Sequence, residues 1–144
     1  MRSNGGSTHR PAVLLAEDEL LVRMLAEETL TQAGFVVHST ESADEALALL
    51  REGLIVDLLV TDIRMPGQMD GIDLARAVLQ ATPALPVIIT SGFTDRQSAL
   101  NDPLKLITFF PKPYDPSLLM SVAAALVGEH KNAAANGSDD ADHL

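Results

Sequence analysis

Two acidic groups in the sequence come directly after short apolar runs. Asp62 ends the run that begins at Leu58, and the pair Glu17-Asp18 follows the run Val13–Ala16. Short apolar runs without polar alternation suit strands that are buried on both faces, as in a parallel sheet. Open α/β sheets place their chemistry at the carboxyl ends of such strands. If the two strands are neighbours, the three carboxylates form one site.

A hydroxyl and a lysine occupy the corresponding places after two later apolar runs. Ser91 ends the run that begins at Val87, and Lys112 stands between two prolines just after Leu106–Phe110. A lysine is a mobile point charge that suits a phosphoryl oxygen, and a serine hydroxyl can donate a hydrogen bond to another. In a parallel sheet these side chains are expected at the same edge as the acids.

Three carboxylates gathered at one edge of a sheet repel each other strongly unless a cation or protons intervene. A site with oxygen ligands alone selects a hard ion, Mg²⁺ or, in its place, Mn²⁺. Once the ion, the lysine and the hydroxyl hold a phosphoryl group, one carboxylate can act as the nucleophile toward phosphorus. The residue types therefore indicate a Mg²⁺-assisted site that forms an aspartyl phosphate.

The elements that position this site alternate strictly between strands and helices. Strands are predicted at residues 13–16, 35–38, 58–62, 87–91 and 106–110. Apolar residues recur with a helical period within residues 21–33, 46–50, 72–79 and 118–126. Residues 93–105 are poorly periodic and contain a proline, so we expect a short or irregular fourth helix there. This alternation predicts a parallel sheet with helices on both faces.

Several helix ends carry recognisable signals. Ser42 and Glu45 have the spacing of a capping box. Gly34 and Gly53 are suited to end the first two helices. The Asp115-Pro116 pair places a capping acid directly before a proline, which is favourable at the first helical position. These signals fix the expected boundaries of three helices.

Composition limits the class of protein. The chain has 144 residues and a formal net charge of -10, which fits one domain and disfavours a nucleic-acid surface. It has no cysteine, so disulfides and thiolate sites are excluded. No apolar stretch approaches the length of a membrane span, and no signal-type segment is present, so we expect a cytoplasmic protein without a membrane partner. We expect a flexible arm at residues 1–10, one domain at 11–127 and a disordered acidic tail at 128–144.

The order of these motifs resembles the receiver domain of response regulators in two-component signalling, over roughly residues 11–127. The resemblance rests on the acidic pair, on the Thr-Asp-Ile-Arg-Met-Pro stretch around Asp62, on Ser91 and on Lys112 followed by proline. Phe109, three residues before the lysine, matches the aromatic switch position of the family. The resemblance implies a flavodoxin-like (βα)5 fold, in which a doubly wound, parallel, five-stranded sheet has the order 2-1-3-4-5. Glutamate rather than aspartate at position 17 is a frequent variant, but the loop Met65–Gly71 is one residue longer than usual.

The resemblance also implies the roles of the acids. Asp62 would accept a phosphoryl group from a phosphohistidine of a sensor histidine kinase or of a histidine phosphotransfer protein. Asp18, Asp62 and the backbone carbonyl of Arg64 would ligate Mg²⁺, and Glu17 would act directly or through water. Such a chain is a phosphoacceptor rather than an enzyme, apart from its own phosphorylation and dephosphorylation.

Signalling in this family depends on a second group of residues. Ser91 and Lys112 would hold phosphoryl oxygens, and Ser91 and Phe109 would act as the switch that changes the face around the last helix. The expected protein is a single-domain response regulator that works by altered binding to other proteins. It would be a monomer, or a dimer that forms on phosphorylation.

Plainer roles and other functions compete with this interpretation. Ser91 also fits a hydroxyl that bonds only to the backbone, Phe109 fits a core residue, and the acid Glu19 fits a helix start. A pseudo-receiver that binds proteins without using its aspartate is the alternative function. A phosphatase of the haloacid dehalogenase type would need a second aspartate two residues after the nucleophile, where Arg64 stands. The four histidines show no paired ligand spacing: His9, His38, His130 and His143.

Overall fold

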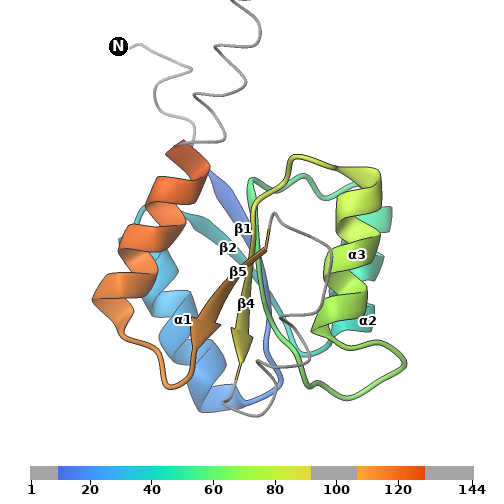
Figure 1. Ribbon diagram of the computed structural model, residues 1–144, viewed down its shortest axis with the longest axis horizontal. Helices are drawn as coiled ribbons and strands as arrows, with labels where there is room; N and C mark the ends of the chain where they lie inside the picture. Colours follow the sequence, from blue (N-terminus) through green and yellow to red (C-terminus); the bar gives the residue numbers. More distant parts are fainter. Residues whose placement is uncertain (1–9, 92–106, 129–144) are drawn as a thin grey trace, which may run out of the picture.

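Five parallel strands form the sheet that carries the candidate site. The computed structural model describes residues 10–91 and 107–128 (Figure 1). The strands are β1 (Ala12–Ala16), β2 (Val36–Thr40), β3 (Leu58–Asp62), β4 (Val87–Ser91) and β5 (Ile107–Pro111). Their order is β2-β1-β3-β4-β5 and all four pairings are parallel, which confirms the predicted topology.

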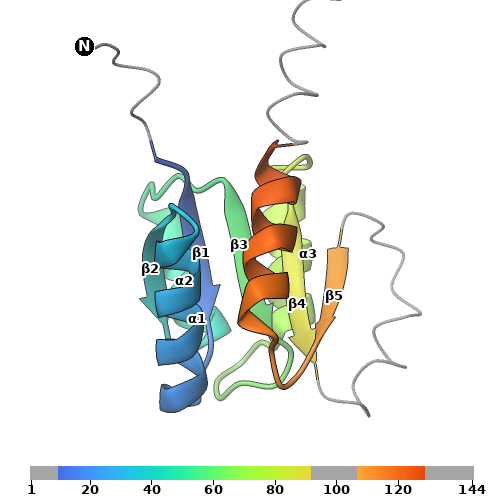
Figure 2. The same ribbon diagram turned by 90° about the vertical axis from the view of Figure 1, so that its left-hand side faces the viewer.

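Helices cover both faces of this sheet (Figures 1 and 2). Figure 1 labels the helices α1 (Leu20–Gln32), α2 (Ala43–Arg51) and α3 (Gly71–Ala81). A further helix, drawn in orange to red, spans residues 116–128. It lies with α1 on one face, whereas α2 and α3 lie on the other. The fold is therefore doubly wound, as expected.

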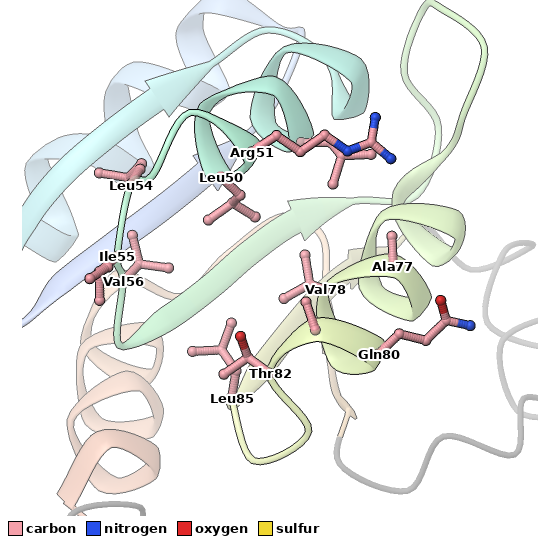
Figure 3. Close-up of a pocket in the computed structure, with 12 residues that line it drawn as sticks. Leu50, Arg51, Leu54, Ile55, Val56, Ala77, Val78, Gln80, Thr82 and Leu85 are labelled. Atoms are coloured by element: carbon pink, nitrogen blue, oxygen red, sulfur yellow. The ribbon is translucent and has the colours of Figure 1, made fainter.

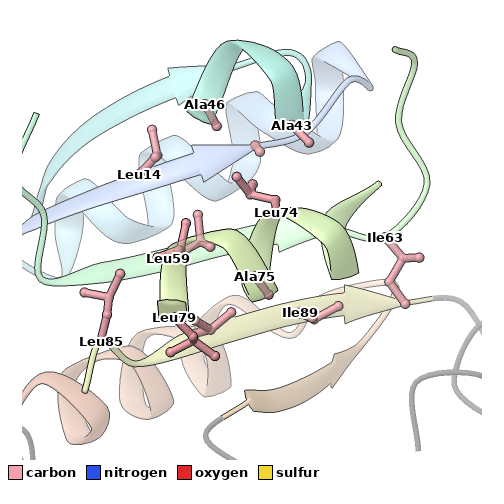
Figure 4. Packing of buried hydrophobic residues seen from close by; sticks show 13 residues of the cluster. Leu14, Ala43, Ala46, Leu59, Ile63, Leu74, Ala75, Leu79, Leu85 and Ile89 are labelled. Carbon is pink, nitrogen blue, oxygen red and sulfur yellow. The ribbon is translucent and has the colours of Figure 1, made fainter. Parts of the chain in front are cut away.

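The core has two layers, one on each side of the sheet. Leu14, Leu59 and Ile89 point toward α2 and α3, where they pack with small residues such as Ala46 and Ala75 (Figure 4). The alternate strand residues pack against α1 and helix 116–128 on the opposite face. All five residues of β3 and of β4 are buried, as expected for strands in the middle of a covered parallel sheet.

The helix ends follow most of the sequence signals. Gly34 and Gly53 adopt positive φ angles just beyond α1 and α2. Asp115 accepts hydrogen bonds from the backbone N–H groups of residues 117 and 118. The box predicted at Ser42 is only half formed: its hydroxyl accepts from the Glu45 N–H, but the Glu45 carboxylate accepts from the N–H of residue 41 instead. The reciprocal bond to the Glu45 carboxylate is therefore donated by Glu41, the residue before the N-cap, rather than by Ser42 itself.

A full capping box occurs where the sequence analysis did not predict one. Asp70 caps α3 by accepting from the Asp73 N–H, and the Asp73 side chain accepts from the Asp70 N–H. An aspartate in place of the usual glutamate at the third helical position hides this signal. The box fixes the start of α3 at the end of the loop that follows β3.

Three expectations concern residues outside the part of the chain that the structure describes. They are the arm at 1–10, apart from Arg10, the short or irregular fourth helix at 93–105, and the tail at 128–144, apart from Gly128. Within the described residues, no helix has the length and apolar character needed to cross a membrane.

Gly71 begins α3 directly against the end of β3. Its N–H donates to the Ile63 carbonyl at 2.7 Å. A side-chain carbon at this position would collide with the backbone of Asp62 and Ile63. Glycine therefore allows α3 to start close beneath the strand end that carries Asp62.

We predict that Gly71→Ala lowers the free energy of unfolding by about 1–3 kcal/mol, because the new methyl group meets backbone atoms that cannot rotate away. Urea denaturation measures this change. Gly128→Ala is the matched control, since this helical glycine has open space around it. The control is expected to be neutral or to stabilise the protein by up to about 1 kcal/mol. Equal losses in both variants would contradict the role assigned to the close approach.

Candidate functional site

The strand order brings four chemically useful side chains to one edge of the sheet. β3 ends at Asp62 and β4 at Ser91, while Glu17 follows β1 and Lys112 follows β5. Because β1, β3, β4 and β5 are consecutive neighbours, these residues come together as the sequence predicted. The backbone N–H of Lys112 donates to the Ser91 carbonyl at 3.1 Å, which continues the β4–β5 pairing into the site.

The side chain of Lys112 bridges two carboxylates. Its Nζ lies 2.8 Å from Asp62 Oδ2 and 3.0 Å from Glu17 Oε1. Burial acts to lower the pKa of Lys112, but the hydrogen bonds to Asp62 and Glu17 outweigh it and hold the pKa above its ordinary value of 10.5. The ammonium is therefore charged at neutral pH and serves both acids at once.

Glu17 is a buried acid, only 1% exposed. Its Oε2 accepts from the Glu19 N–H at 3.1 Å, and its Oε1 accepts from Lys112 and, at 3.5 Å, from the Tyr114 hydroxyl. Burial raises the pKa of Glu17 above 4.5, although its hydrogen bonds to Glu19 and Lys112 act in the opposite direction. The carboxylate is thus held firmly, at an electrostatic cost.

Asp62 is fixed from both of its oxygens. Oδ1 accepts from the Ile63 N–H at 2.7 Å, and Oδ2 accepts from Lys112. The residue is 8% exposed, so its environment is largely protein rather than water. A carboxylate held in this way has a defined orientation toward whatever enters the site.

Ser91 differs from the other site residues in its hydrogen bonding. Its hydroxyl is buried and has no hydrogen-bond partner among the described residues. Buried polar atoms are nearly always bonded, so an unpaired one calls for a partner that the protein itself does not supply. This observation favours a ligand role over the plainer backbone-bonding role for the serine.

The acids at this edge could hold a metal ion. Glu17, Asp18 and Asp62 each offer a carboxylate oxygen, and these oxygens lie within 4.8 Å of one another. Lys112 bridges two of these three acids, so the group still carries more negative than positive charge from the side chains whose contacts the described residues give. Oxygen donors and excess negative charge fit a hard divalent cation such as Mg²⁺. Asp18 is exposed, so it lies on the solvent side of the group.

The other residues that the sequence analysis named are Phe109, Arg64 and the histidines. Phe109 is half-buried on β5 and packs against the core cluster on the α2–α3 side, so it is at least a core residue. Its switching role and the ligand role of the Arg64 carbonyl stay predictions. The Lys112-Pro113 peptide bond is cis. Of the histidines, only His38 lies in the described residues, where it is paired on β2 with Leu14.

Two residues near the site were missed by sequence reasoning. Arg23, on α1, donates to the Glu17 carbonyl at 2.9 Å and so fixes the loop after β1. Tyr114 contacts the Glu17 carboxylate, and burial raises the pKa of this tyrosine to about 12. The signal for Tyr114 was its place directly after Lys112-Pro113; nothing in the sequence distinguished Arg23 from other surface arginines.

An apolar groove lies away from these residues. It has a volume of about 590 Å³ and runs between α2 and α3 (Figure 3). Leu54, Val56 and Leu85 line it, and these residues precede β3 and β4. It therefore lies toward the amino ends of these strands, and its lining contains no carboxylate or histidine. It takes no part in the chemistry at the carboxyl ends.

Comparison with known proteins agrees with the geometry. A family model described as "Response regulator receiver domain" matches residues 13–124. The C4-dicarboxylate transport transcriptional regulatory protein DctD of Rhizobium meliloti is 44% identical over 88 residues, which cover 59% of this chain and 18% of that protein. The DNA-binding transcriptional regulator NtrC of Salmonella typhimurium is 36% identical over 107 residues, which cover 74% of this chain and 22% of that protein. The chain thus spans only about a fifth of the length of these curated relatives.

A solved structure covers the same region more completely. A response regulator receiver protein from Sinorhizobium medicae superposes with a TM-score of 0.78 and 30% identity. The match covers 84% of this chain and 97% of that one. The likeness therefore includes nearly all of the relative's structure.

We predict that the metal-free protein loses stability as the pH rises from 4.5 toward the raised folded pKa of Glu17. In that window the folded state binds more protons than the unfolded state, so the free energy of unfolding falls with increasing pH. Glu17→Gln removes this titration and is expected to flatten the slope relative to wild type. Urea denaturation in a chelating buffer at several pH values measures it. Glu41→Gln, at a side chain 68% exposed, is the control for the loss of one carboxylate; identical slopes for wild type and Glu17→Gln would refute the assignment.

Proposed function

The chain belongs to the response regulator receiver family, and we propose that Asp62 is its phosphoacceptor. The observation that carries this proposal is the Lys112 ammonium, which lies 2.8 Å from Asp62 Oδ2, while the neighbouring strand β4 ends at Ser91, whose buried hydroxyl has no partner among the described residues. A fixed cation and a free hydroxyl next to an oriented carboxylate are what a transferred phosphoryl group requires. Glu17 shares the same ammonium, but it follows β1 at the far side of β3 from Ser91, so Asp62 is the acid that stands between the two.

The proposed step is transfer from nitrogen to oxygen. A carboxylate oxygen of Asp62 attacks the phosphorus of a phosphohistidine, an O–P bond forms, and the P–N bond breaks with its electron pair leaving on the imidazole. Lys112 balances negative charge on the phosphoryl oxygens, and the Ser91 hydroxyl donates a hydrogen bond to one of them. Mg²⁺, or Mn²⁺ in its place, would supply further charge neutralisation when bound.

The proposed metal ligands are the acids that the structure gathers at this edge. Asp18 and Asp62 offer oxygens directly, with the Arg64 backbone carbonyl as a third ligand, and Glu17 acts directly or through water. The clustering of Glu17, Asp18 and Asp62 supports this assignment. Solvent exposure of Asp18 suits an ion that keeps several waters.

The proposed output is a change in protein binding. Ser91 and Phe109 form the switch: the hydroxyl moves to the phosphoryl group, and the ring repacks on the half-buried face of β5. The phosphodonor is a sensor histidine kinase or a histidine phosphotransfer protein. One relative is named "Sensor kinase CckA", of Brucella abortus, and is 39% identical over 104 residues that cover 71% of this chain and 11% of that protein.

Several properties belong to the same proposal. The chain acts as a phosphoacceptor rather than as an enzyme that turns over other substrates. It works in the cytoplasm, where a kinase can make its phosphohistidine from ATP. Its target is a protein rather than nucleic acid, which the net charge of -10 favours. It is a monomer before phosphorylation, and any dimer depends on phosphorylation.

We predict that acetyl phosphate and Mg²⁺ add the mass of one phosphoryl group to the wild type and none to Asp62→Asn. The amide cannot act as the nucleophile but keeps the shape of the carboxylate. Intact-mass spectrometry measures the adduct. Asp57→Asn is the matched control, because Asp57 directly precedes β3, at the opposite end from Asp62, and accepts from the Ala12 N–H. It is expected to label like wild type.

The outcomes separate the proposal from its alternative. An adduct that persists in Asp62→Asn would place the acceptor elsewhere. A folded wild type that takes no adduct would favour the pseudo-receiver, which binds proteins without using its aspartate.

A further inference from the structure

Tyr114 contacts the site from a position that the family pattern of acids, hydroxyl and lysine does not include. Its hydroxyl lies 3.5 Å from Glu17 Oε1, the oxygen that also accepts from Lys112. The ring packs against Phe110 with a centroid separation of 6.2 Å. The side chain of Thr90, the residue before Ser91, also lies near enough to this hydroxyl to act on the pKa of Tyr114. Tyr114 therefore joins the end of β4 to the acid that follows β1.

The two donors to Glu17 Oε1 differ in what else they serve. Lys112 is shared with Asp62, so any negative group that arrives at Asp62 competes for its ammonium. Tyr114 has no hydrogen bond to Asp62 in the described part of the chain, and its ring is held by Phe110. Its hydroxyl therefore remains available to Glu17 when Lys112 turns elsewhere.

We propose that Tyr114 is a positioning residue that holds the Glu17 carboxylate in place for a divalent cation. The Glu19 N–H holds Oε2, the tyrosine hydroxyl holds Oε1, and neither contact depends on Lys112. Groups that orient a metal ligand in this way commonly determine much of its affinity. The inference rests on the proposed function, because it concerns the same metal site.

The length of the Glu17 side chain also contributes to its contact with Tyr114. Glutamate at position 17 extends far enough from the end of β1 to reach both Lys112 and Tyr114. An aspartate there would keep the charge but lose one methylene group of reach. Glu17→Asp therefore separates the contact with Tyr114 from the presence of a carboxylate.

The test is a double-mutant cycle with calorimetric Mg²⁺ titration. Tyr114→Phe keeps the ring on Phe110 and removes only the hydroxyl; we expect it to weaken Mg²⁺ binding about tenfold, at the lower end of the range for residues that orient a ligand. In the Glu17→Asp background the same change should alter affinity by less than about twofold, since the contact is already lost. Ser39→Ala is the matched control, because it removes a hydroxyl that donates to another carboxylate, Glu27, away from the site. It should leave Mg²⁺ affinity within about twofold of wild type.

A second readout needs no metal. The chain has one tyrosine and no tryptophan, so its aromatic emission reports on Tyr114. Loss of a carboxylate acceptor changes tyrosine emission, so Glu17→Asp should shift the emission intensity in chelating buffer while Ser39→Ala does not. Unchanged emission in Glu17→Asp would overturn the hydrogen bond.

The outcomes distinguish this inference from the proposed function. If wild type binds Mg²⁺ and takes the phosphoryl adduct but Tyr114→Phe binds the ion equally well, the role of Tyr114 fails alone. An equal loss from Tyr114→Phe in both Glu17 backgrounds also overturns it, because the effect would not pass through Glu17. If wild type neither binds Mg²⁺ nor takes the adduct, the proposed function fails and this inference with it.

Discussion

Two largely buried carboxylates share one ammonium, and the rest of the site is arranged around that shortage of positive charge. Lys112 is the cation that neutralises both Glu17 and Asp62 in the described structure, while Asp18 adds a third acid at the solvent side. Burial makes each unbalanced charge costly. The remaining charge is met by backbone N–H groups, from Ile63 to Asp62 and from Glu19 to Glu17. A site in this condition favours a cation, and the phosphoryl group proposed for Asp62 would share the lysine with Glu17.

The parallel sheet brings the carboxylates together with too little positive charge, and its rigidity keeps them there. Strand order β2-β1-β3-β4-β5 places the acids of β1 and β3 side by side and brings the β5 lysine across β4 to meet them. The buried strands leave the carboxylates little freedom to move apart. Gly71 allows α3 to start against the backbone of Asp62, so the strand end is supported from below as well as from its neighbours. The rigid scaffold thus holds charges together that would separate in a flexible chain.

Much of this could be predicted from the sequence, because the signals are local. The apolar runs identified all five strands to within two residues, and Gly34, Gly53 and Asp115 marked helix ends correctly. Asp62 and Lys112 were placed together because parallel strands end at one edge. The misses concern which partner a polar side chain selects, a choice that the folded geometry decides. Arg23 reaches the Glu17 carbonyl from α1, and the Glu45 carboxylate bonds one residue earlier than the capping pattern requires. Both partners lie near each other in the chain, but the residue types and spacing do not say which of several available groups each side chain contacts.

The difference in burial between Glu17 and Asp18 divides the work of the acidic pair. Glu17 is 1% exposed and accepts hydrogen bonds at both oxygens, so it is fixed in direction but carries the electrostatic cost of burial. Asp18 is exposed, so it can exchange water for an ion with little change in its own solvation. In the proposed metal site, the fixed acid would therefore set the geometry, and the exposed acid would govern how easily an ion enters. In the proposed reaction Lys112 would turn to the phosphoryl group, and Glu17 would keep the N–H of Glu19 and the hydroxyl of Tyr114 as donors.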